Sequence, residues 1–375
     1  MRRRTLTPIA LLSLVALLLS GLLAFPRPAQ AAFDTKMRYF GHLEAAGGGS
    51  ITDVAVVEPY AYLAEGTGGL RVADVRERVE VPSYIAAYDP AQLRKLDAAN
   101  GFLYGVDSTG DLHVYSLQQP RSPAQVGSLA LDISSDIHVA GSYVYALNPA
   151  GLLIIDVSAP QAPKQVGSLA IPDALDLAVD GLTVFVTSCC TSTATFPNGP
   201  LRSIDVSKAA SPVQLDMVNA GGRKLTVTDG VVYTIQGGCA DVCTGTLATV
   251  DAHDPNNLVV IEQRGLTTVP SPLPSQVLAM AGQLFYTRDY CRFICNGLGI
   301  EAFNIDTTSL KPAYSDGIGY PRNFTQQADA LVPYEPASNG LVFAGNRLYI
   351  PFGTQGMLIF EAGRYRTYLP ALIGP

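Results

Sequence analysis

The sequence predicts an all-β protein, a seven-bladed β-propeller built from four-stranded antiparallel blades. Three observations predict this fold. A unit of short strands and turns recurs along most of the chain, its aromatic residue returns at a spacing of about 40 residues, and turn-forming residues are abundant. The 375-residue chain contains 35 glycines and 26 prolines, which suits many turns between short strands better than long helices. It is 48% hydrophobic and 15% charged, a composition typical of globular proteins.

Residues 136–171 contain the clearest copy of the unit. An apolar first strand is followed by a turn, a second strand with an aromatic residue, and the third strand Leu152–Val157. This third strand is apolar at consecutive positions, so we expect both of its faces to be buried, because neighbouring side chains point to opposite faces. The alternative, a pair of β-sandwiches, would alternate polar and apolar residues on most strands. The recurring aromatics are Tyr62, Tyr104, Tyr145, Phe185, Tyr233, Tyr286 and Tyr349.

The turns of the unit also follow a pattern. Glycine pairs such as Ala140-Gly141 and Asp180-Gly181 separate the first strand from the second, and two-residue hairpin turns need the positive φ that glycine adopts freely. The first copy has Glu58-Pro59 instead, so we expect a different type of turn there. Prolines such as Pro160 and Pro163 follow the third strand and separate it from a fourth. Four strands per copy, stacked round an axis, form a propeller.

The N-terminal part of the mature chain predicts how the ring closes. Residues 38–43 resemble the fourth strands at 125–129 and 165–169, but no first three strands precede them. We therefore expect the strand at about 37–44 to join the last blade as its outer strand, beside Met357–Phe360. This arrangement hides two otherwise open sheet edges.

The first 31 residues are predicted to be a signal peptide. Three arginines at positions 2–4 precede the apolar run Ile9–Leu23, and Ala29-Gln30-Ala31 provides a small-x-small cleavage site. The run is shorter than the roughly 20 residues that a membrane-spanning helix needs, so a membrane anchor is the less favoured alternative. The expected domains are the signal peptide at 1–31, the propeller at 32–363 and a C-terminal tail at 364–375. We expect a secreted or cell-surface protein.

The charge of the chain excludes one class of partner. The net charge is −7, and cleavage of the signal peptide removes arginines but no acidic residue, so the mature chain is still more acidic. Nucleic-acid binding requires a basic surface, and we expect no nucleic-acid partner. No later apolar run is long enough to cross a membrane. We expect a monomer without a membrane span in its mature part.

The stretch Leu152-Leu153-Ile154-Ile155-Asp156-Val157-Ser158-Ala159-Pro160 resembles the LVIVD repeat of secreted bacterial proteins. Related copies span about 50 to 361. The resemblance implies an extracellular or surface β-propeller and carries no general enzymatic assignment. The chain has no tryptophan, which disfavours propellers of the WD and kelch types.

All six cysteines fall between the second and third strands of blades 4 to 6, so we expect them on one rim of the propeller. An even number of cysteines in an exported protein favours disulfides. A thiolate metal site is the alternative, although Cys-x₃-Cys is wider than the usual spacing. If paired, Cys239–Cys243 and Cys291–Cys295 would each close a small loop, and Cys189–Cys190 would be either a strained adjacent pair or linked to a neighbouring blade. Because six cysteines allow 15 pairings, the sequence does not choose between these and other pairings. The disulfide candidates are Cys189, Cys190, Cys239, Cys243, Cys291 and Cys295.

Four carboxylates are candidates for a site in the central channel. They lie near the start of the first strands in blades 1 to 4, and such a ring of acids can hold a cation. The favoured interpretation is that they accept hydrogen bonds from backbone N–H groups of the entry loops. Blade 5 has Arg223-Lys224 near the equivalent place, and these basic residues would neutralise part of the ring. The candidates are Asp53, Asp97, Asp136 and Asp176.

Motifs for catalysis or cofactor binding are not found. The histidines are scattered without metal-ligand spacing, and no nucleophile elbow, phosphate loop or dinucleotide fingerprint occurs. We therefore name no catalytic residue and predict no cofactor.

The enlarged segment 314–339 joins blades 6 and 7, and long loops in compact domains are often functional. Packing over the rim of the propeller is the alternative role. We expect an exported, non-enzymatic module that binds a protein, peptide or glycan through the loop face of blades 4 to 7. The less favoured alternative is an extracellular hydrolase or lyase with carboxylates at the channel mouth. The candidate ligand-contacting residues are Tyr314, Tyr320, Phe324 and Tyr334.

Overall fold

The computed structural model divides the chain into two units, Met1–Ala32 and Phe33–Pro375. The residues that it describes all belong to the second unit, and the predicted signal peptide and C-terminal tail lie outside them. The described residues are 34–45, 49–76, 83–88, 92–188, 199–236, 245–266, 277–280, 283–291, 295–305, 312–318, 341–351, 353 and 356–363. Within these ranges no helix is long and apolar enough to cross a membrane.

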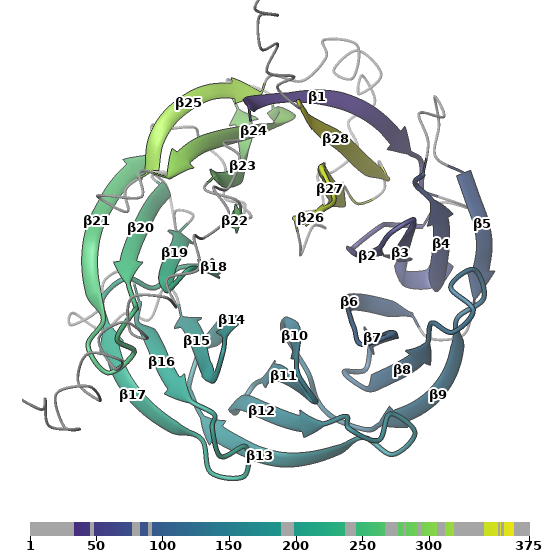
Figure 1. The fold of residues 1–375 in the computed structure, drawn as a ribbon, viewed down its shortest axis with the longest axis horizontal. Coiled ribbons are helices and arrows are strands. Elements are labelled where there is room, and N and C mark those ends of the chain that lie inside the picture. Colours follow the sequence, from purple (N-terminus) through teal and green to yellow (C-terminus); the bar gives the residue numbers. More distant parts are fainter. Residues whose placement is uncertain are drawn as a thin grey trace, which may run out of the picture. The chain divides into compact units, whose positions relative to one another are not determined.

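The regular structure is almost entirely β. Apart from the 3-10 turn Gly66–Gly68, the described elements are strands β1 to β28, and these form seven four-stranded antiparallel sheets. Figure 1 shows the sheets around a common centre, each running from an inner to an outer strand. The predicted all-β propeller of four-stranded antiparallel blades is confirmed in these features.

We number the blades along the chain, and their strands have the following bounds. Blade 1 is β2 (Asp53–Val57), β3 (Tyr60–Ala64), β4 (Leu70–Asp74) and β5 (Ser83–Tyr88). Blade 2 is β6 (Leu93–Ala99), β7 (Phe102–Asp107), β8 (Leu112–Ser116) and β9 (Ala124–Leu129). Blade 3 is β10 (Ile137–Ala140), β11 (Tyr143–Asn148), β12 (Gly151–Asp156) and β13 (Lys164–Ala170). Blade 4 is β14 (Ala174–Asp180), β15 (Thr183–Ser188), β16 (Leu201–Asp205) and β17 (Val213–Val218).

The remaining blades follow the same order. Blade 5 is β18 (Lys224–Thr228), β19 (Val231–Gln236), β20 (Gly245–Asp251) and β21 (Val259–Leu266). Blade 6 is β22 (Val277–Met280), β23 (Gln283–Cys291), β24 (Cys295–Ile305) and β25 (Pro312–Ile318). Blade 7 is β26 (Val342–Ala344), β27 (Arg347–Pro351) and β28 (Met357–Gly363), completed by β1 (Asp34–Leu43).

The N-terminal strand closes the ring as the sequence predicts. Strand β1 pairs antiparallel with β28, from Asp34 opposite Gly363 to Leu43 opposite Met357. The inner strands of successive blades contact each other from β26 through β2 to β22. Between blades 6 and 7, β1 also contacts β24 and β25. The N-terminal strand therefore completes blade 7 and also contacts blade 6.

The core lies between the blades. In β12, Gly151 to Ile155 are all buried and only Asp156 is partly exposed, as expected for a strand covered on both faces. The aromatic of the second strand is also buried in the six blades whose side chains are described there. These buried aromatics are Tyr62, Tyr104, Tyr145, Phe185, Tyr233 and Tyr349.

The aromatic predicted for blade 6, Tyr286, lies on the second strand β23 as expected, but one position later in its strand than the aromatics of the other blades. In the other blades the aromatic is the third residue of the second strand, as for Tyr104 in β7. Strand β23 begins at Gln283, so its third residue is Phe285, which pairs with Leu278. Phe285 and Tyr286 are adjacent aromatic residues, so the one at the third position of the strand is known only once the start of the strand is known.

The turns between first and second strands agree with the predicted glycine pattern. Gly141, Gly181 and Gly345 have positive φ values of 59°, 58° and 60°, as two-residue hairpin turns require. The exceptional Glu58-Pro59 turn has a cis peptide bond and no positive φ. It is therefore a different type of turn, as expected.

Candidate functional site

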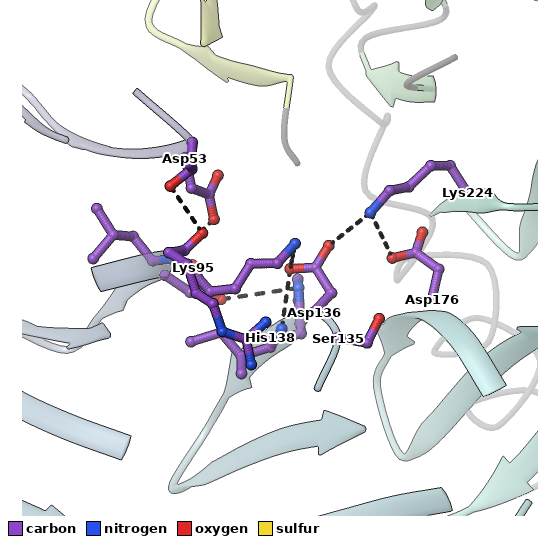
Figure 2. Close-up of polar contacts among 12 residues, drawn as sticks. Asp53, Lys95, Ser135, Asp136, His138, Asp176 and Lys224 are labelled. Atoms are coloured by element: carbon purple, nitrogen blue, oxygen red, sulfur yellow. Dashed lines mark hydrogen bonds and ion pairs between the residues drawn. The ribbon is translucent and has the colours of Figure 1, made fainter. Parts of the chain in front are cut away.

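Five charged residues occupy one level of the central channel in blades 1 to 5. In four of these blades the charged residue pairs with the residue that comes two positions after the buried aromatic of the second strand. The pairs are Asp53–Ala64, Lys95–Val106, Asp176–Thr187 and Lys224–Ile235. Asp136 holds the same place in blade 3, directly before Ile137, which pairs with Ala146. We call these five residues the charge ring, and Figure 2 shows them around the channel: Asp53, Lys95, Asp136, Asp176 and Lys224.

One predicted member does not belong to the ring. Asp97 lies further along β6, opposite Tyr104, and Lys95 takes the ring position in blade 2. The prediction was wrong because it placed acids near the start of each first strand, whereas β6 begins earlier, at Leu93. Counting back from the aromatic of each second strand identifies Lys95 from the sequence alone.

Four of the five ring residues are buried and Asp136 is partly exposed, and the charges of the ring contact one another. Asp53, Lys95 and Asp176 are 3%, 4% and 3% exposed. Lys224 Nζ lies 3.2 Å from Asp176 Oδ1 and 3.3 Å from Asp136 Oδ2, and Figure 2 shows the lysine between the two acids. Lys95 Nζ lies 3.7 Å from Asp136 Oδ1. Asp136 is therefore held by lysines from two different blades.

The aspartates also join neighbouring blades through the backbone. The Leu96 N–H donates to Asp53 Oδ2 over 2.9 Å, and the Leu225 N–H donates to Asp176 Oδ2 over 2.8 Å. In each case the donor directly follows a ring lysine of the next blade. Backbone N–H groups are thus bound, as the favoured interpretation expects, but they come from the next inner strand and not from an entry loop.

A second pair of this kind lies two residues further along the first strands of blades 2 and 3. Asp97 accepts a hydrogen bond from the Val139 N–H over 2.7 Å, and His138 Nδ1 lies 3.9 Å from Asp97 Oδ2. The acid of one blade again faces a basic residue of the next and binds the N–H that follows it. The His138 side chain is 45% exposed, more than that of any ring member.

Asp136 departs from this pattern because the residue beyond it in blade 4 is an acid, Asp176. It accepts the N–H of its own neighbour Ile137 over 3.0 Å and binds the two lysines. Its side chain also has a hydrogen bond with that of Asp176. Two carboxylates at neighbouring places in a buried ring repel each other when both are ionised. Lys224, which contacts both, offsets that repulsion.

Burial and these contacts shift the proton affinities of the ring. Burial raises the pKa of Asp53 to about 7, although Lys95 and two backbone N–H groups act in the opposite direction. Burial also raises the pKa of Asp176 to about 6, against the attraction of Lys224. For Asp136, burial acts to raise the pKa, but Lys95 and Lys224 outweigh it and hold the pKa well below its usual range. The ring contains one more acid than base, and one retained proton makes it neutral.

The polar groups of the charge ring bind one another and the backbone. Among the described residues, no group of three or more His, Cys, Asp or Glu side chains is arranged to hold a metal ion. The ring carboxylates instead contact ammonium groups and backbone N–H groups. Each ring residue has a partner within the protein, so the described contacts favour a structural role for these residues.

The other predicted residues are placed only in part. Cys291 ends β23 and Cys295 begins β24, and the two are partners across the hairpin. Tyr314 lies within β25, paired with Phe303, so it does not belong to the connection between blades 6 and 7, where it was predicted. The candidates that lie outside the described residues are Cys189, Cys190, Cys239, Cys243, Tyr320, Phe324 and Tyr334.

Comparisons with known proteins agree with the repeat and the fold. The family model of the LVIVD repeat matches residues 48–81 and 133–170. The chain therefore contains LVIVD repeats at these two segments, and the resemblance seen in the sequence is confirmed there. No match was found among curated proteins.

Solved structures of similar fold are distant in sequence. The computationally designed protein Ika8 is 10% identical, with a TM-score of 0.53, and the match covers 86% of this chain and 99% of that one. Sqt1 from Saccharomyces cerevisiae is 9% identical, with a TM-score of 0.53, and the match covers 87% and 99%. A chain of an S. cerevisiae complex of Dbp5 with Nup159 and Gle1 is 10% identical, with a TM-score of 0.53 and coverages of 87% and 94%. At such identities the likeness extends to the fold alone.

Proposed function

We propose that the protein is an exported, non-enzymatic β-propeller that binds a protein, peptide or glycan. The binding surface is one face of blades 4 to 7, which we call the hairpin face. It is formed by the connections between second and third strands and by the connections that enter each blade from the blade before it. Export rests on the signal peptide at 1–31 and on the resemblance to secreted LVIVD-repeat proteins. The mature chain acts outside the cytoplasm, in solution or at the cell surface.

One observation carries the proposal: the blades differ mainly on the hairpin face. In blades 1 to 3 the second and third strands are joined by the short connections 65–69, 108–111 and 149–150. The corresponding connections in blades 4 and 5 are 189–200 and 237–244, and in blade 6 the strands themselves are longer. Binding residues are disproportionately found on loops that a rigid scaffold positions, and here the scaffold repeats while one face varies.

The short connections are fixed by local hydrogen bonds. In blade 2, Asp107 Oδ1 accepts the N–H groups of Thr109 and Asp111 over 2.9 and 3.0 Å. In blade 3, Asn148 Oδ1 accepts the N–H groups of Ala150 and Gly151 over 2.9 and 3.0 Å. An Asp or Asn side chain that accepts hydrogen bonds from backbone N–H groups of its own turn stabilises that turn. These ends of blades 2 and 3 therefore read as scaffold.

The hydrolase or lyase alternative receives less support from the channel. A general acid or base must reach the reacting atom at hydrogen-bond distance. Asp53 and Asp176 are almost fully buried and already accept backbone N–H groups. His138 is more exposed than the residues of the charge ring. The acid that faces it, Asp97, already accepts a hydrogen bond from the next blade.

The proposal is tested by shortening the hairpin face. In one variant the blade 4 connection 189–200 is replaced by the short Pro149-Ala150 connection of blade 3; in another, residues 319–340 are replaced by a short glycine-serine linker. This second replacement begins after Ile318 because β25 extends to that residue. The matched control is Leu182→Ser, in the β14–β15 turn at the opposite end of blade 4, where Leu182 is 64% exposed.

Each purified variant is immobilised and exposed to a glycan array, a peptide library and an extract of the native cell envelope. We expect the wild type and Leu182→Ser to retain the same ligand and at least one hairpin-face variant to lose it. Equal retention by all four proteins removes the hairpin face from the proposal. Turnover of a glycan or peptide by the wild type, abolished by His138→Ala, would replace it with the enzymatic alternative.

A further inference from the structure

The hairpin of β23 and β24 brings two cysteines together. Cys291 is the last residue of β23 and Cys295 is the first residue of β24, and their Cα atoms are direct partners in the antiparallel pairing. Directly opposite residues of antiparallel strands have Cα atoms about 4.5 to 5.5 Å apart. Disulfides usually join residues whose Cα atoms are about 4.4 to 6.8 Å apart. We propose that Cys291 and Cys295 form a disulfide across the end of this hairpin.

The register selects this pairing from the many that six cysteines allow. A disulfide needs a short Cα separation and Cβ atoms that do not point apart. Directly opposite residues of antiparallel strands meet both conditions, because they lie on the same face of the sheet, and Cys291 and Cys295 are such partners. The pairing shifts by one residue between Asp289 and Cys291, and the cysteines resume it beyond the shift. A covalent bond at this place keeps the last pair of the hairpin in register.

The hairpin extends beyond the ends of its neighbours. Thr287 in blade 6 holds the place of Ala64, the last residue of β3 in blade 1. Strand β23 continues beyond this place to Cys291. With 9 and 11 residues, β23 and β24 are longer than β15 and β16, which have 6 and 5. An isolated two-stranded ribbon is only marginally stable in water. The disulfide stabilises the part of the hairpin that has the least support from the blade.

The chemistry balances as a thiol–disulfide exchange. Each thiol loses its proton, the two sulfurs form one bond, and the two electrons pass to an external disulfide, which becomes two thiols. The external oxidant is glutathione disulfide or the disulfide of an oxidase protein. Inside the cell this exchange needs an oxidising compartment, so it rests on the proposed export. In the test the purified protein is oxidised directly, so a failure of export does not affect the result.

The sequence around the hairpin makes the bond visible by mass spectrometry. Trypsin cleaves after Arg288 and after Arg292, and Arg292 lies between the two cysteines. The full chain is reduced, reoxidised in glutathione buffer, blocked with an alkylating reagent, denatured and digested. We expect peptide 289–292 to be joined to peptide 293–322 and to separate from it on reduction. The second peptide extends past Lys311 because Pro312 follows it.

Two outcomes overturn the proposal. One is the recovery of Cys291 and Cys295 as separate alkylated peptides after oxidation. The other is a stable link from either residue to Cys189, Cys190, Cys239 or Cys243. Cys295→Ser should expose one additional thiol, that of Cys291, while the number of thiols elsewhere stays the same.

Hydrogen exchange tests the effect on the hairpin itself. Reduction should speed amide exchange in the peptides that cover residues 288–298 by tenfold or more. The buried strand β12 in the same sample should exchange at an unchanged rate. Unchanged exchange at 288–298 in protein shown by mass to be reduced would contradict a stabilising role for the bond.

Discussion

Asp136 is the residue on which the charge ring depends. It is the ring acid that contacts both Lys95 and Lys224, and these lysines come from blades 2 and 5. The other two ring acids each bind a backbone N–H of the next blade, so their hydrogen bonds remain if a lysine moves. Removing a single partner from a buried ion pair usually costs more than the pair itself contributes, because the remaining charge is left buried and uncompensated.

We predict that Asp136→Asn lowers the free energy of unfolding by about 3 kcal/mol. The amide keeps the shape of the side chain but leaves Lys95 and Lys224 with one acid fewer. Urea unfolding at pH 7 measures the change. Asp132→Asn, at an exposed position nearby in the same chain segment, is the control and should change stability by less than about 0.5 kcal/mol. Equal losses in the two variants would contradict a special role for Asp136.

We also predict a pH dependence that originates at Asp53. Burial raises its native pKa to about 7 from 3.8, so between these values the native state retains a proton that the unfolded chain has lost. The stabilisation linked to this proton is complete below the unfolded pKa and is lost as the pH rises through 7. One such group lowers the unfolding free energy by up to about 1.4 kcal/mol per pH unit in this window.

The measurement is urea unfolding of the wild type and Asp53→Asn at pH 5, 6, 7 and 8. The variant should be less pH-dependent between pH 5 and 7, because asparagine does not titrate. The contribution of Asp176, whose pKa is raised to about 6, remains in both proteins. Identical pH profiles would show that Asp53 is ionised throughout the range.

At the scale of elements, the outer strands show how closely the blades approach one another. A Cβ atom on Gly127 in β9 would lie 2.1 Å from the carbonyl oxygen of Pro160 in blade 3. A Cβ atom on Gly167 in β13 would lie 1.8 Å from the carbonyl oxygen of Ala209 in blade 4. Both glycines pair with the centre of a third strand. The glycine in the repeated Val-Gly-Ser-Leu of these two fourth strands is therefore required by the backbone of the next blade.

We expect Gly167→Ala to destabilise the protein by about 1–3 kcal/mol, since the carbonyl must move to admit the methyl group. Gly265→Ala is the matched control. Gly265 also lies in an outer strand, β21, and a Cβ atom there meets nothing within 4 Å. Thermal unfolding of both variants decides the matter. A loss of similar size at Gly265 would attribute the effect to strand propensity and not to the contact between blades.

Blades 1 and 4 each use a hydroxyl group to contact the next blade, but the hydroxyl comes from different strands of the blade. In blade 1 the Tyr62 hydroxyl donates to the Pro120 carbonyl of blade 2 over 3.0 Å. Blade 4 has Phe185 at the place of the tyrosine, and its strand partner Ser203 donates to the Pro255 carbonyl of blade 5 over 2.6 Å. The same contact between blades is thus made from the adjacent strand.

The regular elements were predictable because each gives a local signal. The consecutive apolar residues of β12 and the glycine turns identify the unit, and the likeness of residues 38–43 to fourth strands identifies the ring closure. The place of Lys95 and Asp97 was missed because β6 begins before the acid. The contact of Lys224 with Asp136 joins residues from non-adjacent blades and depends on the width of the channel, which no local pattern encodes.

At the scale of the whole molecule, the N-terminal strand holds the ring together. β1 completes blade 7 and also contacts β24 and β25 of blade 6. Arg347 of β27 contacts β1 and blade 1: its guanidinium lies 3.7 Å from the centre of the Phe40 ring, and it donates to the carbonyl of Val75. Strand β1 and Arg347 thus connect blade 7 with both of its neighbours, blade 6 and blade 1.

We predict that a chain lacking residues 34–43 expands or associates, because the edge of β28 loses its pairing. Size-exclusion chromatography with light scattering measures this change. A synthetic peptide of residues 34–43 should restore the compact species by strand addition, and a scrambled peptide of the same composition should not. A compact, monomeric deletion variant would contradict the role assigned to β1.

The central claim is that the repeated blades form a scaffold and that the hairpin face of blades 4 to 7 binds the ligand. Hydrogen exchange of the full chain, with and without the ligand retained by the wild type, tests it most directly. The claim predicts slower exchange in peptides from 189–200, 237–244 and 288–298 and little change in the turns at Gly101, Gly141 and Gly181. Protection confined to those turns, or to the channel strands β2, β6 and β10, would contradict it.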